Sequence, residues 1–138
     1  MCSKRVAGAI AAGLMLLPGI ASALTTYTCS LNVAASQNWV PELVVVTHDE
    51  AKGKIIVADP VIMYFNDRQP VEGRIAVNNN KRITFNWELK ASDASGQRAT
   101  MDYRMTYLRG NNTVSIQAQP LGYESGYQAT GICEVKRK

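Results

Sequence analysis

The sequence predicts an all-β protein, namely a small antiparallel up-and-down β-barrel of about eight strands with a calycin-like order of strands. Three observations support this prediction. Apolar and polar residues alternate with a period of two along much of the chain, short polar turns separate the alternating stretches, and two cysteines lie near opposite ends of the expected domain.

The beginning of the chain predicts a secretory signal peptide. Lys4 and Arg5 form a basic head, and an apolar run covers residues 6–20. Ala21 and Ala23 then supply small side chains at the −3 and −1 positions of a cleavage site. The protein is therefore expected in the periplasm or outside the cell.

Processing after residue 23 defines the expected domain. Residues 1–23 are expected to be removed, and residues 24–138, about 115 residues, are enough for one domain with a single core. Cys2 leaves with the signal peptide. No second apolar run reaches the length of a membrane helix, so we expect no transmembrane segment after processing.

About eight or nine short stretches are predicted to be strands. They are residues 25–33, 43–47, 54–58, 61–65, 74–77, 82–89, 101–107, 113–119 and 127–135. Asp59 and Pro60 interrupt an apolar stretch between the third and fourth of them. Because proline donates no ladder hydrogen bond, we expect a sharp corner there between two strands.

Cysteine placement predicts that the meander closes. Cys29 and Cys133 remain after processing, and an even pair in an oxidising compartment implies one disulfide. Each lies on the inward face of its predicted strand, so the first and last strands should be neighbours and the sheet should close into a barrel. The apolar run from Val44 to Val46 leaves two alternatives, an inner strand or a sheet edge that pairs in a dimer.

Two other β-architectures fit the sequence less well. An immunoglobulin-like sandwich places a tyrosine two residues before its second cysteine, whereas here Tyr27 precedes the first cysteine. The cysteines are also 104 positions apart, too far for that pattern. A lipocalin has a Gly-x-Trp signature at its first strand, whereas this chain has Gln37, Asn38 and Trp39.

Charge and residue types argue against several function classes. Loss of the basic head lowers the formal net charge from +4 to about +2, too little to favour nucleic acid as a partner. His48 is the only histidine, and it lies at the mouth of a predicted polar turn. With both remaining cysteines committed to a disulfide, we predict no metal site, no cofactor and no nucleophile triad.

Carboxylates are the remaining candidates for catalysis. Glu88 and Asp102 lie within successive long strands and are the candidates for a general acid and base pair. Both fall on the polar faces of their strands, so we interpret them as solvated groups that pair across strands with Arg82 or Arg104. The sequence thus predicts a protein that is not an enzyme.

Aromatic residues near loops are the candidate binding residues. Tyr64 leads into a loop that contains Arg68, and Tyr123 and Tyr127 surround a glycine-bounded turn. Tyrosine provides a large contact area at a small entropic cost, so loops rich in tyrosine and glycine are typical recognition surfaces. The alternative is that Tyr64 and Tyr127 pack into the barrel mouth and only Tyr123 is exposed. Trp39 and Trp87 are expected in the core.

Three function classes compete at this stage. The favoured one is a non-catalytic binding module that recognises a protein or an extracellular polymer through its loops. The second is a carrier of a small apolar ligand in the barrel interior, and the third is a carboxylate-dependent enzyme. Interior volume separates them, because bulky inward residues such as Phe85 and Tyr103 favour a filled barrel.

Overall fold

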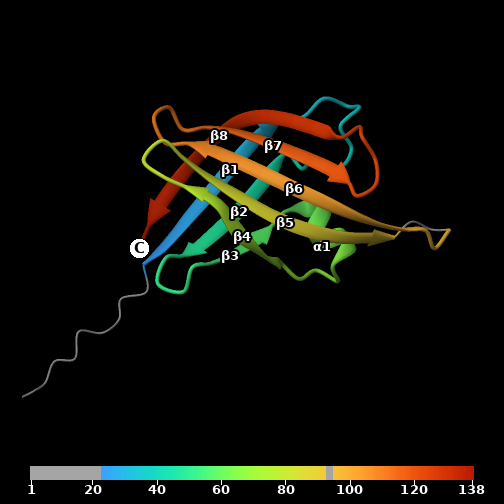
Figure 1. Cartoon of the computed structure of the whole chain (residues 1–138), viewed down its shortest axis with the longest axis horizontal. Helices are drawn as coiled ribbons and strands as arrows, with labels where there is room; N and C mark the ends of the chain where they lie inside the picture. The colour runs from blue at the N-terminus through green and yellow to red at the C-terminus, as the bar shows by residue number, and fades with distance from the viewer. Residues whose placement is uncertain (1–22, 93–94) are drawn as a thin grey trace, which may run out of the picture.

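The computed structural model describes residues 23–92 and 95–138, which form eight β-strands and one short α-helix (Figure 1). The first half comprises β1 (Leu24–Asn32), β2 (Leu43–Asp49), β3 (Lys54–Ala58) and α1 (Pro60–Phe65). The second half comprises β4 (Val71–Asn78), β5 (Arg82–Ser92), β6 (Arg98–Leu108), β7 (Thr113–Pro120) and β8 (Tyr127–Arg137). The predicted signal peptide falls almost entirely on residues 1–22, outside the described part of the chain.

The strands form a closed up-and-down barrel, as the sequence predicts. Each strand pairs antiparallel with the next, and β8 returns to pair with β1. β2 pairs on both sides, with β1 and β3, so the run from Val44 to Val46 is an inner strand and not a dimer edge. Within the described residues, no helix is both long and apolar enough to cross a membrane.

Because every strand reverses direction, the connections fall alternately at the two ends of the barrel. We call one of them the α1 end. It carries residues 33–42, the segment containing α1, the β5–β6 turn and the β7–β8 loop, all at the right of Figure 1. The remaining turns lie at the opposite end, together with the start of β1 and the C-terminus.

Residues 61–65, predicted as a strand, belong instead to helix α1. The structure confirms the predicted corner at Asp59 and Pro60, but the chain turns there into a helix and not into a second strand. The Asp59 carboxylate accepts a hydrogen bond from the Ile62 N–H at 2.7 Å, which caps the helix. Pro60 occupies the first helical turn, where its missing N–H costs nothing. Ile62 is fully buried and fixes the helix against the core.

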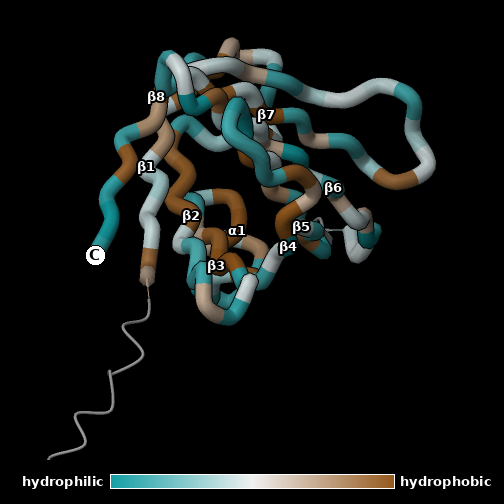
Figure 2. The backbone as a smooth tube through the Cα atoms, turned by 60° about the vertical axis from the view of Figure 1, so that its left-hand side comes forward, coloured by the Kyte–Doolittle hydropathy of each residue, from teal (hydrophilic) through white to brown (hydrophobic). Residues whose placement is uncertain are grey.

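Large side chains fill the barrel interior. The rings of Tyr27 and Phe85 lie 5.1 Å apart and those of Tyr27 and Tyr107 lie 5.3 Å apart, both edge to face. Trp87 stacks on Tyr103 at 5.4 Å. These rings are all buried, and so are Met101 and Met105. The core also contains Ile83, Leu89, Ile116 and the inward residues of β1–β3. Figure 2 shows hydrophobic and hydrophilic residues following one another along the strands.

His48 adjoins the predicted polar turn, as expected, but its side chain is buried. It is the last inward-facing residue of β2 and is only 5% exposed. Burial lowers the pKa of His48 below its ordinary value, although the nearby charges of Glu50 and Asp49 act in the opposite direction. The position belongs to the core at the end opposite α1.

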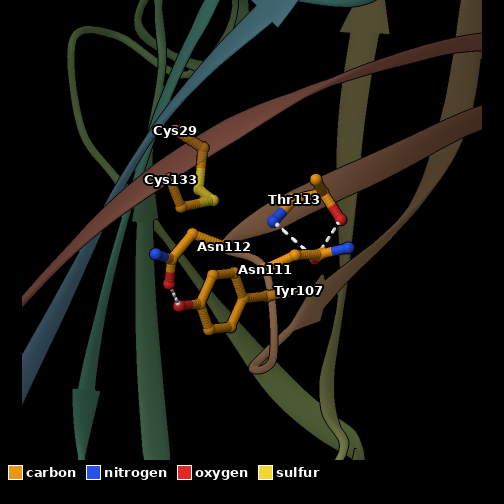
Figure 3. The surroundings of a disulfide bond; sticks show 6 residues. All are labelled: Cys29, Tyr107, Asn111, Asn112, Thr113 and Cys133. Carbon is orange, nitrogen blue, oxygen red and sulfur yellow. Dashed lines mark hydrogen bonds between the residues drawn. A yellow bond between two sulfur atoms is a disulfide. The ribbon is translucent and has the colours of Figure 1, made fainter.

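The disulfide joins directly opposed residues of the first and last strands (Figure 3). The Cα atoms of Cys29 and Cys133 are 4.0 Å apart, and the Cys133 N–H donates to the Asn112 carbonyl at 2.9 Å. The Asn112 side chain accepts a hydrogen bond from the Tyr107 hydroxyl. The β6–β7 turn therefore packs beside the bridge and connects it to the core.

Loss of the disulfide should destabilise the protein strongly. The bridge spans 104 positions, for which the chain-entropy model gives up to about 4 to 5 kcal/mol. We expect the double variant Cys29→Ser/Cys133→Ser to unfold at a much lower urea concentration than the oxidised protein. Adding reductant to the double variant is the control and should change nothing. Equal urea midpoints for the variant and the oxidised protein would show that closure does not depend on the bridge.

Trp87 should be a major contributor to core stability. Trp87→Ala removes a buried ring stacked on Tyr103, and we expect it to lower the free energy of unfolding by about 3 to 5 kcal/mol. Arg104→Ala, on the exposed face of β6, is the matched control and should change it by less than about 0.5 kcal/mol. Urea denaturation followed by far-UV circular dichroism measures both. A near-neutral Trp87→Ala would contradict the inward orientation of this residue.

Candidate functional site

Topology brings the predicted binding residues to one end of the barrel. Tyr64 and Arg68 lie in the connection between β3 and β4, and Tyr123 lies in the loop between β7 and β8. Tyr127 begins β8 at the same end. Figure 2 shows the β7–β8 loop projecting from the barrel wall. These residues are far apart in the sequence, and the alternation of connections in a closed meander brings them to the same end.

Three rings form the centre of the site, and we call Trp39, Tyr64 and Phe65 the aromatic platform. Trp39 stacks on Phe65 with ring centroids 5.2 Å apart, and Tyr64 meets Phe65 edge to face at 4.8 Å. Tyr64 is 80% exposed, whereas Trp39 and Phe65 are half-buried. The expectation that Tyr64 packs into the barrel mouth is therefore wrong, and so is the assignment of Trp39 to the buried core.

The core holds the aromatic platform in place from below. The Tyr103 hydroxyl donates to the Trp39 carbonyl at 2.7 Å and fixes the β1–β2 connection to β6. Tyr103 in turn stacks on Trp87 inside the barrel. On the other side, the Asp59 cap and buried Ile62 orient α1 so that Tyr64 points outward. The platform is thus a rigid extension of the core and not a flexible loop tip.

A cleft of about 800 Å³ lies beside the platform, and we call it the end cleft. It is lined by Trp39, Tyr64, Phe65, Ala91, Ser92, Gln97, Arg98, Ala99, Thr100, Leu121 and Tyr123. Tyr123 is 67% exposed and Leu121 is 55% exposed, so the β7–β8 loop adds an apolar rim. Its described lining contains one cation, Arg98, and no carboxylate. Such a surface can hold an apolar or aromatic group and one acceptor-bearing group.

Two of the predicted binding residues lie apart from the end cleft. Arg68 is exposed in the tight turn after α1, where it has a φ of 61° and its N–H donates to the Met63 carbonyl. Tyr127 is half-buried and packs against the core, as the alternative for this residue proposes. It lines a separate polar hollow of about 320 Å³ together with several glutamines.

The sequence analysis missed Phe65 and Leu121 as binding residues and placed Trp39 elsewhere. One signal could have found Phe65. Val61, Tyr64 and Phe65 have the i, i+3, i+4 spacing of one helix face, and Asp59 with Pro60 is a helix start signal. Trp39 and Leu121 lie in irregular segments, where no periodicity indicates which way a side chain points.

A second hollow of about 520 Å³ lies on the outer wall where β4 meets β5, and we call it the polar groove. Glu72, Arg74, Glu88, Lys90 and Asp102 contribute its charged groups. Glu88 lies directly opposite Asp102 in the β5–β6 register, so the predicted pairing of these carboxylates with Arg82 or Arg104 is wrong. Among residues 23–92 and 95–138, the only ion pair joins Glu134 and Lys136.

The described residues gather no set of three or more His, Cys, Asp or Glu side chains that could hold a metal ion. Glu88 and Asp102 lie on the outer face of the wall, whereas His48 is buried at the end opposite α1. The groups considered for catalysis are therefore separated by the barrel wall.

Asp59 has a strongly perturbed pKa beside the aromatic platform. It is 5% exposed, and burial raises its pKa from 3.8 to about 6, although backbone N–H groups of Ile62 and Val61 favour the ionised form. Burial, followed by the nearby Asp59 carboxylate, also raises the pKa of Tyr103. The helix cap and the group that anchors Trp39 thus share one low-dielectric environment.

Protein-family models, curated proteins and solved structures contain no match to this chain.

The Asp59→Asn variant should gain stability relative to the unmodified protein as the pH rises from about 4 to about 7. The folded-state pKa of Asp59, about 6, lies above its ordinary value of 3.8, so the folded state binds more protons within this window. Ionisation above the window costs up to about 3 kcal/mol, which asparagine avoids while it still accepts the Ile62 hydrogen bond. Urea unfolding at several pH values measures the difference. A stability difference independent of pH would contradict the buried carboxylate.

Proposed function

We propose that this chain is an exported, non-catalytic binding module that recognises a protein or an extracellular polymer through its α1 end. The aromatic platform carries the proposal. It places exposed Tyr64 on rigidly held Trp39 and Phe65, beside the end cleft with its Tyr123 rim. Rigid aromatic side chains bind at a low entropic cost, and exposed apolar groups of this kind mark interaction sites.

Export is part of the proposal and has two supports. The first is the basic and apolar pattern of the N-terminal residues, and the second is the disulfide between Cys29 and Cys133. A disulfide is consistent with an oxidising compartment.

A carrier of a small apolar ligand is the second candidate. The filled interior argues against a ligand inside the barrel, because Tyr27, Phe85 and Tyr103 occupy that space. The volume of the end cleft, about 800 Å³, favours a ligand at the barrel mouth instead. An enzyme has the least support, since Glu88 and Asp102 lie together on the outer wall without a buried acid beside them.

The proposal predicts that a macromolecule contacts Tyr64 and Tyr123. A photo-reactive benzoylphenylalanine at either position, in the full chain produced in its own host, should form covalent adducts of higher mass on irradiation. Both side chains are exposed, so neither replacement should unfold the protein. The same group at Lys52, exposed at the opposite end, is the control and should give none.

Adducts at Lys52 alone, or at all three positions equally, would contradict recognition through the α1 end.

Native mass spectrometry of the purified protein distinguishes the binding module from the carrier of a small ligand. A small added mass that leaves on denaturation would indicate the carrier, whereas a bare monomer mass together with adducts at Tyr64 supports the binding module.

A further inference from the structure

The barrel wall is incompletely paired along β5. β5 pairs with β6 over its whole length, from Arg82 to Ser92. Its ladder with β4 ends at Asn86, opposite Arg74, although β5 continues for six residues beyond that pair. We call residues 87–92 on the β4 side the β5 edge. A strand edge of this kind offers backbone groups to another extended chain.

Two hydrogen bonds establish which backbone groups point into this gap. The Asn79 N–H donates to the Arg82 carbonyl at 3.0 Å, so the backbone N–H and C=O groups of Arg82 point toward β4. The Arg109 N–H donates to the Lys81 carbonyl at 2.9 Å, so the backbone groups of Lys81 point toward β6. Because orientation alternates along a strand, the N–H and C=O groups of Glu88 and Lys90 point away from β6. No β4 residue pairs with either of them.

The β5 edge lies inside a groove and not on an open surface. The polar groove has β5 residues 86–90 on one wall, and Asn66 with residues 71–74 on the other. The next residues of β5, Ala91 and Ser92, line the end cleft together with Phe65. The backbones of the two strands are still close at Gly73, where an added Cβ would lie 2.6 Å from the Asn86 carbonyl, and the ladder has no pair beyond this point toward α1.

The charges in the groove indicate the chemistry of an occupant. Glu72 lies on one wall, and Glu88 lies on the other with Asp102 directly beside it. We call these three carboxylates the acidic row. Arg74 and Lys90 lie one step to either side of this acidic row, yet none of the three carboxylates forms an ion pair with a described residue. A basic side chain between Glu72 and Glu88 would meet carboxylates that form no ion pair with the described residues.

We propose that an extended peptide segment of a partner protein adds as a strand to the β5 edge and places a lysine or arginine against the acidic row. The proposal rests on the proposed function, because the same segment would reach the aromatic platform along the end cleft. The edge is about 20 Å long, enough for six peptide residues. The opposing wall of Asn66 and residues 71–74 favours a single extended chain over the folded edge of a second copy.

The unliganded protein provides the first test. By hydrogen exchange followed by NMR, the amides of Leu89 and Ala91 should be protected by the β6 ladder. The amide of Lys90, between them, should exchange at least a hundredfold faster. Comparable protection of Lys90 and Leu89 would show that the edge is already satisfied and would overturn the proposal.

Two synthetic octapeptides provide the second test, one alternating lysine with valine and one alternating glutamate with valine. The lysine peptide should bind and slow the exchange of the Lys90 amide, and the glutamate peptide should bind at least tenfold more weakly. Equal binding of both, or binding without protection of Lys90, would overturn the proposed pairing.

A pair of variants separates the backbone from the side chain. Lys90→Pro removes the edge N–H and leaves the β6 ladder intact, because that N–H points away from β6. It should weaken the lysine peptide at least tenfold, whereas Lys90→Ala should not weaken it. Thermal unfolding confirms that both variants fold, and an unfolded Lys90→Pro is replaced by a lysine peptide N-methylated along its backbone, which should not bind. Unchanged binding to folded Lys90→Pro, or binding of the methylated peptide, would overturn strand addition.

The experiments distinguish failure of strand addition at the β5 edge from failure of the proposed function. Adducts at Tyr64 that persist in Lys90→Pro would support recognition through the α1 end and overturn strand addition. Peptide binding at Lys90 without adducts at Tyr64 or Tyr123 would support strand addition and overturn the loops as the recognition surface. A dimer that dissociates on the Lys90→Pro change would identify a second copy as the occupant and overturn a partner peptide.

Discussion

Closure of the sheet by β1 and β8 is the constraint on which the rest of the structure depends. Eight strands closed in this way leave an interior only as wide as side chains can fill, and here aromatic rings fill it. Closure also forces the connections to alternate between the two ends. Binding surfaces are therefore confined to the ends and the outer wall. The Cys29–Cys133 bridge locks the pair of strands that enforces all of this.

A single local event at Asp59 and Pro60 creates both features of the proposed binding surface. The cap turns residues 60–65 into a helix and removes them from the wall. The helix carries Tyr64 and Phe65 to the platform. As a strand, the same residues would extend the wall, whereas the ladder between β4 and β5 ends at Asn86 and leaves the later part of β5 unpaired on its β4 side. The aromatic platform and the β5 edge are thus two results of one helix cap.

The sequence predicts the barrel well because alternation is a local signal. Strand positions, the inward face of Trp87 and the pairing of Cys29 with Cys133 all follow from a period of two and a closed meander. The helix was missed because the apolar run after Pro60 has the length of a strand, and the capping geometry decides between the two. The grouping of Trp39 with Phe65, and the gap beside β5, depend on strand lengths and long-range packing that no local pattern contains.

The acidic row on the outer wall is explained by the core. A β5–β6 register shifted by two residues would place Glu88 opposite Arg104 and relieve the repulsion from Asp102, which costs a fraction of a kcal/mol. The same shift would separate Trp87 from Tyr103, now stacked across these strands. Stacking of the two rings contributes about 0.5 to 1.5 kcal/mol beyond their burial, more than the repulsion between the exposed carboxylates costs, so the core sets the register and the carboxylates remain opposed. Negative charge that the fold leaves unneutralised at a strand edge is then available for a partner to neutralise.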